Sequence, residues 1–374
     1  MKITSIKAYH LKVPLKNKYH LSKAIGTLYY TEPIVVKVMT DVGIVGFGEA
    51  DPLVGFTHET PETIKCVIRE ILGPKLLGTN PLNIGLVVEK LDDILCDNLL
   101  SKAAFDMACY DILGKVHNTP IHSLLGGKLR DETKIMVGLG GDEPNKNAED
   151  ALNMKNEGYG TIMIKVGGLS VEQDVERVSA IRKAVDEDFP LVVDANQGWD
   201  PATAIKFAKS IEPYNIEFME QPVPAWDIDG MAYVRSRSPI PISADEGVQS
   251  IHDAIMLIRH QAADIFSIKV VKHGGIYKTR KIMNVAEAFG IPCLMNSMIE
   301  MGITQAASQH LGAVSKNLCH IGNCYASPLR LKVDVTDYHK LVNHGVATIT
   351  DQPGLGILID EEMIDRYKVD EFML

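Results

Sequence analysis

Residues 161–194 have the sequence TIMIKVGGLSVEQDVERVSAIRKAVDEDFPLVVD, and the pattern in this stretch decides the fold. The apolar run 161–166 predicts a buried strand, and the run 191–194 predicts another. Between them an apolar residue recurs every three or four positions, which predicts a helix over residues 171–185. A strand, a helix and a second strand in succession indicate that the two strands pair in parallel.

The same alternation continues along most of the chain. The predicted strands are 134–139, 161–166, 191–194, 216–219, 240–243, 265–270, 292–295 and a weaker one near 319–322. Such a series closes either as an open doubly wound sheet or as a (β/α)₈-type barrel. A dinucleotide-binding sheet should show GxGxxG after an early strand, and Gly138-Leu139-Gly140-Gly141 lacks that spacing. Eight units favour the barrel.

The two ends of the chain differ from this pattern. Strands are predicted at 3–13, 34–39 and 44–49, and helices begin near Thr60 and cover 101–115. Residues 16–31 are predicted as a long loop, and loops of that length are often functional. We therefore expect a capping domain over 1–130, a barrel over 131–325, and a segment 326–374 that returns to the capping domain.

Composition excludes several classes of protein. The chain has 374 residues, with 38 Lys and Arg against 48 Asp and Glu, for a net charge of −10. This acidic balance argues against a nucleic-acid partner, which needs clustered Lys and Arg. No apolar run reaches the roughly 20 residues that span a bilayer, so no membrane partner is expected. The first residues lack a signal-peptide core and the six cysteines form no CxxC pair, so we expect reduced thiols and a cytoplasmic location.

A charged residue stands at or near the end of five successive predicted strands, and the last of them, Lys269, lies within its strand. These residues are Lys165, Asp194, Glu220, Asp245 and Lys269, each about one βα unit from the next. One such residue alone is usually a solvated loop residue or part of a surface ion pair. Active sites of parallel barrels, however, lie where the strands end, so five residues placed regularly are expected to converge there.

Three carboxylates side by side repel one another unless a cation lies among them. Ligands that are all oxygen favour Mg²⁺ over zinc or copper. The pattern therefore predicts a magnesium site at the barrel mouth, with one lysine on each side of it.

Several separate motifs, in order along the chain, resemble the enolase superfamily, and within it the mandelate racemase and muconate lactonizing enzyme family. They are Ala104-Phe105-Asp106-Met107-Ala108, Leu124-Leu125-Gly126-Gly127, Ile164-Lys165-Val166-Gly167, Val193-Asp194-Ala195-Asn196, Met219-Glu220-Gln221-Pro222, Ala244-Asp245-Glu246, Ile268-Lys269 and Pro353-Gly354-Leu355-Gly356. The resemblance runs over nearly the whole length. It implies a modified (β/α)₇β TIM-type barrel with an N-terminal α+β capping domain, whose loops at 16–31 and 51–58 cover the substrate.

The resemblance also implies roles for the five charged residues. Asp194, Glu220 and Asp245 match the family's Mg²⁺ ligands, with Mn²⁺ as a possible substitute. Lys165 matches the second lysine of the KxK motif, and Lys269 matches the opposing lysine, a pair similar to the muconate lactonizing subgroup. The implied chemistry is removal of the proton next to a carboxylate, with the metal stabilising an enediolate.

Further polar and aromatic residues are candidates for binding substrate or for supporting the site. They are Asn196, Glu246, Asn296 and Glu300 beside the strand ends, and Tyr19, Tyr30 and Phe56 on the capping loops. Lys272 and His273 are predicted instead to lie in a solvated loop.

Two positions depart from the family pattern. Met163 occupies the first lysine position of KxK, so lowering the pKa of Lys165 would depend on Mg²⁺, burial or Lys269. Dipeptide epimerases carry Asp-x-Asp after the last strand to hold an ammonium group. The matching stretch 320–325 lacks this pair, which disfavours a dipeptide substrate.

Three functions remain open at this point. The first is a racemase or epimerase of an amino-acid derivative, either an N-acyl amino acid or a proline-type compound. The second is a dehydratase of the hydroxyproline type, or a muconate-type cycloisomerase, using the same lysine pair. The third is a silent relative that binds ligand without proton exchange. In each case the partner is a small carboxylate, and we expect a homo-oligomer.

Overall fold

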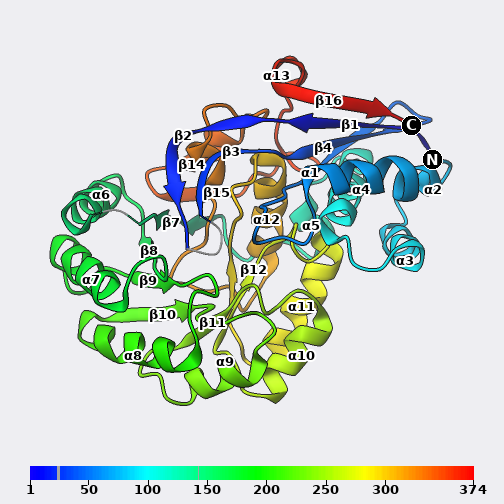
Figure 1. Cartoon of the computed structure of the whole chain (residues 1–374). Helices are drawn as coiled ribbons and strands as arrows, with labels where there is room; N and C mark the ends of the chain where they lie inside the picture. The colour runs from blue at the N-terminus through cyan, green and yellow to red at the C-terminus, as the bar shows by residue number, and fades with distance from the viewer. Residues whose placement is uncertain (23–25, 142) are drawn as a thin grey trace.

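The computed structural model describes residues 1–22, 26–141 and 143–374. A parallel sheet wrapped by helices forms one part of the molecule, and an antiparallel sheet with its own helices covers one side of it (Figure 1). This is the predicted α/β barrel with an N-terminal α+β cap. Among the described residues, no helix has both the length and the apolar character needed to cross a membrane.

Seven parallel strands form the barrel sheet, in the order β13-β12-β11-β10-β9-β8-β7. Their bounds are β7 (Met136–Leu139), β8 (Thr161–Lys165), β9 (Leu191–Asp194), β10 (Ile216–Glu220), β11 (Ile242–Ala244), β12 (Ile265–Ile268) and β13 (Cys293–Met295). The strands are almost continuously apolar and buried, as expected where both faces of a parallel sheet are covered.

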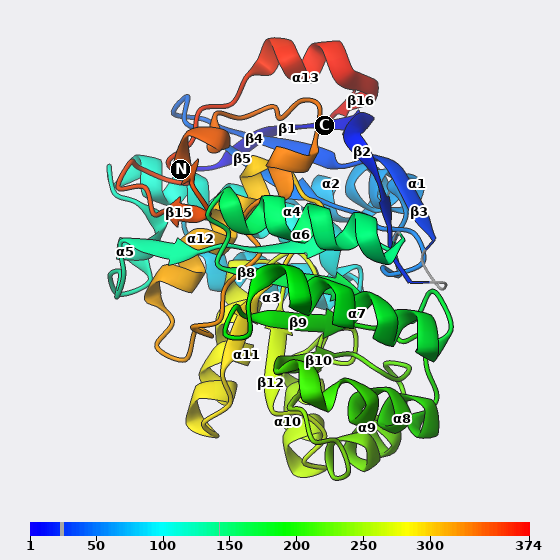
Figure 2. The same cartoon turned by 90° about the vertical axis from the view of Figure 1, so that its left-hand side faces the viewer.

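Helices that follow the strands surround this sheet, and Figure 2 shows α6, α7 and α8 stacked side by side. They are α6 (Pro144–Asn156), α7 (Val171–Val185), α8 (Pro201–Ile211), α9 (Ile228–Arg235), α10 (Ile251–Arg259), α11 (Ile276–Ala288) and α12 (Gly302–Val314). Ser170 begins α7 with a capping box shared with Gln173, which explains why its predicted start is confirmed.

The predicted eighth strand near 319–322 is not a regular strand. Single bridges instead join Leu318 to Cys293 on one edge of the sheet and Asn323 to Ile135 at the other. Between the two bridges Gly322 adopts a φ of +151°, which interrupts the ladder. The segment still closes the barrel, since it contacts both edge strands.

The first predicted barrel strand, 134–139, is divided in two. Residues Glu132–Lys134 (β6) pair with β15 (Val346–Thr348), which in turn pairs with β14 (Val342–Asn343), and only β7 enters the barrel. The amide of Ile135 donates to the carbonyl of Gly345, so the strand changes partner at that residue.

The cap sheet has the order β16-β1-β4-β5, with β1 (Ile3–Leu11), β4 (Ile34–Thr40), β5 (Val45–Ala50) and β16 (Lys368–Met373). The first and last strands of the chain thus lie side by side, the blue and red arrows of Figure 1. Its helices are α1 (Pro61–Cys66), α2 (Gly73–Leu76), α3 (Ile84–Ile94), α4 (Leu99–Val116) and α5 (Ile121–Leu124), with a π-helical turn at Val67–Leu72; α13 (Glu361–Tyr367) precedes β16.

Helix α4 packs closely on the cap sheet. A Cβ at Gly48 of β5 would collide with the carbonyl oxygen of Ala104, and one at Gly46 with that of Ala108. Glycine at these two positions allows the helix backbone to lie directly on the strand. This contact holds β5 against α4, and the loop at 51–58 continues from the end of β5.

The predicted loop at 16–31 is largely a β-hairpin. Strand β2 (Val13–His20) pairs with β3 (Thr27–Thr31), with Tyr19 opposite Leu28 and Pro14 opposite Tyr30. Residues 23–25 of the predicted loop lie outside the described residues. The sequence does not predict this pairing, because the polar run Lys16–Lys18 interrupts the alternation of apolar and polar residues that is typical of a strand.

Candidate active site

The carboxyl ends of five neighbouring strands bring the five predicted charged residues to one place. Lys165, Asp194 and Glu220 are the last residues of β8, β9 and β10, while Asp245 and Lys269 directly follow β11 and β12. Lys165 lies opposite Asp194 in the ladder, and Asp194 lies opposite Glu220. The two lysines therefore stand at the two sides of a row of three carboxylates.

Each lysine forms an ion pair with the carboxylate next to it. Lys165 Nζ donates to Asp194 Oδ2, and also to Asn196 Oδ1 at 3.2 Å. Lys269 Nζ donates to Asp245 Oδ2, and it lies 4.1 Å from the ring centre of Phe56. Both carboxylates are fully buried, so these are charge pairs held away from water.

Glu220 stands between the two pairs and is completely buried. Its Oε1 accepts a hydrogen bond from Asn296 Nδ2 at 2.9 Å, while its Oε2 has no hydrogen-bond partner. Burial, followed by the charges of Asp194 and Asp245, raises the pKa of Glu220 well above its usual value. A carboxylate in this position needs either a proton or a cation.

The charges around each lysine outweigh its burial. Burial by itself would lower the pKa of Lys165. The negative charge of Asp194 raises that pKa by more than burial lowers it, so the pKa lies above its usual range. The pKa of Lys269 is likewise raised, because Asp245 and Glu220 overcome the effect of burial. Neither lysine becomes a base near neutral pH while the carboxylates keep their full charge.

Lys272 and His273 do not lie in a solvated loop, and this prediction is wrong. Each side chain is 1% exposed. Lys272 Nζ donates to Asp245 Oδ1 at 2.7 Å, and the ring of His273 pairs with the carbonyl of Gln249 at 2.9 Å. The turn after β12 folds inward here, and Asp245 therefore lies between two ammonium groups.

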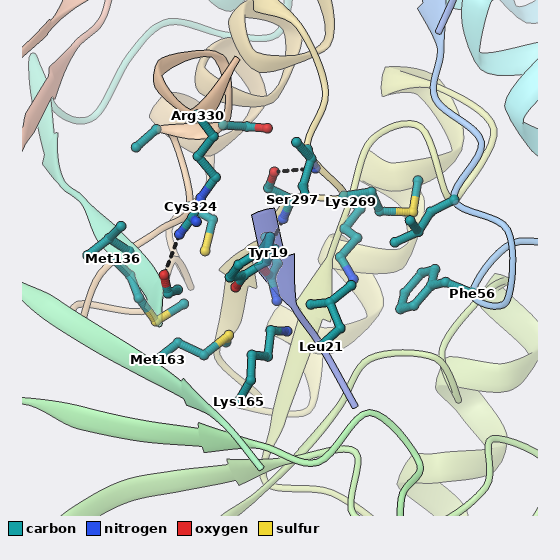
Figure 3. A pocket seen from close by; sticks show the side chains of 18 of the residues that line it. Tyr19, Leu21, Phe56, Met136, Met163, Lys165, Lys269, Ser297, Cys324 and Arg330 are labelled. Carbon is teal, nitrogen blue, oxygen red and sulfur yellow. Dashed lines mark hydrogen bonds between the residues drawn. The ribbon is translucent and has the colours of Figure 1, made fainter. Parts of the chain in front are cut away.

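A cavity opens directly above the charged row. Six predicted residues line it: Tyr19, Phe56, Lys165, Asn196, Lys269 and Asn296. Figure 3 shows the two lysine side chains entering from different strands, with Phe56 beside Lys269 and Tyr19 over the space between them. Among the described residues, no aspartate or glutamate belongs to the cavity wall. The three carboxylates lie beneath it.

Other residues of the wall were missed by sequence analysis. Met136 lies on one side of it, beside Met163, which the sequence marked only as the departure from the KxK motif. Cys324, Ser327 and Arg330 come from the segment that follows the barrel closure. For Cys324, Ser327 and Arg330 the signal that would have found them is position, because they follow the last predicted strand. That strand has only a weak apolar pattern, so the sequence does not mark where it ends.

Three predicted residues are not brought to the cavity. Tyr30 is 43% exposed and stacks against Lys12, because the hairpin places it at the far end from Tyr19. Glu300 turns away and accepts hydrogen bonds from the amide of Met298 and from Gln305. Glu246 is buried, and it accepts from Asn196 at 3.1 Å without reaching the wall.

The residues beneath the cavity fit a divalent cation of the magnesium type. Asp194, Glu220 and Asp245 offer oxygen atoms from adjacent strand ends, which is the donor set that Mg²⁺ prefers. Glu220 Oε2 is a buried atom without a partner, as a ligand atom would be. In the described part of the chain, no three acidic, imidazole or thiol groups stand together at ligand distance. The outer two carboxylates form ion pairs with Lys165 and Lys269.

Comparison with known families gives two matches. Residues 5–126 match the mandelate racemase / muconate lactonizing enzyme N-terminal domain, and residues 146–363 match the enolase C-terminal domain-like family. Together they cover both the cap and the barrel.

Individual proteins match over almost the whole chain. N-succinyl-L-Arg/Lys racemase of Bacillus cereus is 35% identical over 99% of this chain and 98% of its own, and its crystal structure superposes with a TM-score of 0.96. A dipeptide epimerase of Cytophaga hutchinsonii, crystallised with Mg and D-Ala-L-Val, is 31% identical over the full length of both chains with a TM-score of 0.93. Chloromuconate cycloisomerase of Cupriavidus pinatubonensis is 32% identical over 89% of this chain and 90% of its own.

Proposed function

Since the chain belongs to the mandelate racemase and muconate lactonizing enzyme family of the enolase superfamily, we propose that it is a Mg²⁺-dependent racemase or epimerase of an amino-acid derivative. The substrate is a small carboxylate, either an N-acyl amino acid or a proline-type compound. The reaction removes the proton on the carbon next to the carboxylate and returns a proton to that carbon. Mn²⁺ is proposed as a substitute for Mg²⁺.

The observation that carries this proposal is the placement of the two lysines. Lys165 and Lys269 enter the cavity from β8 and from the end of β12, on the two sides of the carboxylate row. A planar carbon between them can lose a proton to one lysine and receive a proton from the other. Inversion of configuration needs this two-sided arrangement.

Asp194, Glu220 and Asp245 would hold the metal. When bound, Mg²⁺ supplies positive charge to the carboxylate oxygens of a substrate and offsets the negative charge of its three ligands. With that negative charge offset, burial is left as the main influence on the two lysines, and burial lowers a lysine pKa. The bound metal would thereby help lower the pKa of Lys165, a role that the first lysine of the KxK motif has in the family and that Met163 cannot take here.

The cap residues exclude water from the reacting atoms. Phe56 covers Lys269, and Tyr19 lies over the space between the lysines (Figure 3). Asn196 and Asn296 hold Lys165 and Glu220 through hydrogen bonds of 3.2 and 2.9 Å. A dry and ordered site of this kind strengthens each electrostatic contact.

The test is exchange of the substrate α-proton in D₂O, followed by NMR, with and without a chelator. Pools of N-acyl amino acids, proline derivatives, dipeptides and muconates would be offered to the wild type, Lys165→Ala and Lys269→Ala. We expect metal-dependent deuterium uptake, with both stereoisomers appearing in the wild type. Each single variant should lose exchange of one stereoisomer and all interconversion. Equal loss of both stereoisomers in both variants would contradict the two-sided mechanism.

Cycloisomerisation is the second candidate function. It is favoured by the 32% identity to chloromuconate cycloisomerase and by the same lysine pair. The same experiment separates the two, because a lactone signal from muconate without exchange of any amino-acid derivative would replace the racemase assignment.

A further inference from the structure

Helix α4 of the cap contacts both the cap strand β5 and the barrel helix α11. Its residue Ala104 meets β5 at Gly48, where the two backbones touch. Asp106 is two positions further on, which is about 200° around an α-helix. It therefore faces the other way, and its carboxyl group reaches the start of α11.

The carboxylate of Asp106 accepts hydrogen bonds from the first backbone amides of α11. The amide of Ile276 donates to its Oδ1, and the amide of Tyr277 donates to its Oδ2 at 3.3 Å. The first amides of a helix have no partner within it, and Gly275, the residue before them, has no side chain that could supply one. A residue 170 positions away in the chain therefore caps this helix.

The helix amides are the groups that stabilise the negative charge of Asp106. Its side chain is completely buried, and among the described residues it forms no ion pair. Lys278 lies nearby on α11, but its ammonium group pairs with Asp92. Burial raises the pKa of Asp106 to about 7, while the hydrogen bonds from the two amides act in the opposite direction.

Gly275 makes room for this contact. Its φ is +104°, in a region of backbone conformation that is nearly restricted to glycine. A Cβ at this position would also collide with the carboxyl group of Asp106. The carboxyl group can approach the helix only because this residue has no side chain.

A short turn, residues 269–275, connects α11 to Lys269. The amide of Gly275 donates to the carbonyl of Val270 at 2.9 Å, and the amide of His273 donates to the carbonyl of Lys269 at 3.3 Å. These bonds join the two ends of the turn, so a displacement at the start of α11 would reach Lys269. Phe56, which lies over Lys269, is on the loop that follows β5. Helix α4 is thus connected to both members of that contact.

The turn after Lys165 is held in a different way. The amide of Gly167 donates to Asp174 Oδ2 at 2.8 Å, and Asp174 lies on the barrel helix α7, where it pairs with Arg177. This carboxylate belongs to the barrel, whereas the one that holds the start of α11 belongs to the cap. A change at Asp106 is therefore expected to affect Lys269 and not Lys165.

We propose that Asp106 is a positioning residue for Lys269. By binding the first amides of α11 it holds the turn 269–275, and it thereby keeps the lysine beneath Phe56 and directed into the cavity. The inference deepens the proposed function and rests on it for its kinetic test, because only one of the two lysines should depend on Asp106.

Three variants separate this role from a general loss of stability. Asp106→Ala removes both acceptor atoms, and Asp106→Asn keeps one acceptor in the same shape. Asp334→Asn is the matched control, since Asp334 also binds the first amide of a barrel helix, that of Gly302 on α12, at 3.2 Å. Burial raises the pKa of Asp334 to about 7 as well, but α12 is not connected to the turn of either lysine. A thermal melt of every variant checks folding.

The first measurement is hydrogen–deuterium exchange at pH 8 without substrate, followed by mass spectrometry. Loss of hydrogen bonds to a charged acceptor predicts that amides of residues 269–277 exchange about tenfold to a hundredfold faster in Asp106→Ala. Asp106→Asn should lie between this variant and wild type. Asp334→Asn should match wild type over 269–277, and residues 165–170 should match it in every variant. Unchanged exchange over 269–277 in Asp106→Ala would overturn the proposal.

The second measurement is kcat for α-proton exchange, taken separately for each stereoisomer of one substrate with Mg²⁺ present. Lys269→Ala identifies the stereoisomer that Lys269 serves. In Asp106→Ala we expect kcat for that stereoisomer to fall about tenfold, while the other stays within about twofold and KM changes little. Asp334→Asn should not distinguish the stereoisomers. Equal loss for both in folded Asp106→Ala, or in Asp106→Asn if the alanine variant does not fold, would overturn the proposal.

The two measurements separate this inference from the reaction itself. Faster amide exchange over 269–277 in Asp106→Ala, together with no α-proton exchange in wild type, would support Asp106 as the residue that holds the turn of Lys269 and would remove only the racemase assignment. Full α-proton exchange of both stereoisomers in Asp106→Ala would overturn the positioning role and leave the racemase assignment in place.

Discussion

Phe56 of the cap lies directly over Lys269 of the barrel, with the lysine Nζ 4.1 Å from the ring centre. The ring is 7% exposed, so it covers an ammonium group that is itself 3% exposed. A loop of one part of the fold thereby completes the surroundings of a catalytic candidate in the other. The contact is an attractive cation–π interaction as well as a barrier to water.

Replacing Phe56 should therefore reduce turnover more than folding. We expect Phe56→Ala to lower kcat for α-proton exchange by about tenfold, since water gains access to Lys269 and the cation–π contact is lost. Phe289→Ala is the control, because that ring is 64% exposed on the surface. A drop in kcat of the same size in the control variant would show that the effect is not local.

Glu220 offers a test of the metal site that does not depend on activity. Its buried carboxylate is unfavourable without a cation, so Glu220→Gln should melt at or above the wild-type temperature when a chelator is present. Added Mg²⁺ should stabilise wild type by about 2.7 kcal/mol at a hundred times its dissociation constant, and should stabilise the variant little. Glu217→Gln, on the same strand, should keep the full response. A metal response retained in Glu220→Gln would remove Glu220 from the ligand set.

Gly48 tests the close packing of β5 on α4 within the cap. In Gly48→Ala the new Cβ would strike the Ala104 carbonyl of α4, and both groups belong to backbone that cannot move aside freely. We expect a loss of about 3 kcal/mol in unfolding free energy, measured by denaturant titration. In the control Gly160→Ala, the Cβ would meet only the aliphatic chain of exposed Lys134, at 3.2 Å, and the loss should stay below about 1 kcal/mol. Similar losses in both variants would contradict the packing argument.

His310 predicts a loss of stability in acid. It is buried, its Nε2 donates to the carbonyl of Leu355 at 3.1 Å, and its Nδ1 accepts from the amide of His122 at 3.4 Å. Burial, which favours the neutral ring, lowers the pKa of His310 to about 4. Between pH 6.5 and 4 the unfolded chain therefore binds a proton that the folded chain does not, so stability falls as pH falls through this window.

The size of this effect is about 3 kcal/mol across the window, because the pKa falls from 6.5 to about 4 on folding. His310→Gln lacks the titrating group, so its unfolding free energy should depend less on pH between 4 and 6.5. His339→Gln, at an exposed histidine, should retain the wild-type slope. An unchanged slope in His310→Gln would show that other groups cause the acid sensitivity.

The amino-acid sequence alone determined the barrel and the row of charges at its mouth. Both follow from local rules: apolar periodicity defines strands and helices, and a residue at the end of a parallel strand lies at the active-site edge wherever the fold closes. That is why Lys165, Asp194, Glu220, Asp245 and Lys269 could be placed together in advance.

Only the tertiary structure decided which other groups reach that place. Arg330 and Phe56 come from segments far apart in the chain, and their approach depends on barrel closure and on the packing of β5 on α4 within the cap. The burial of Lys272 depends on an inward turn. Tyr30 and Glu300 point away from the cavity because of the hairpin register and of hydrogen bonds after β13. These are long-range contacts, and no periodicity within a short stretch of sequence records them.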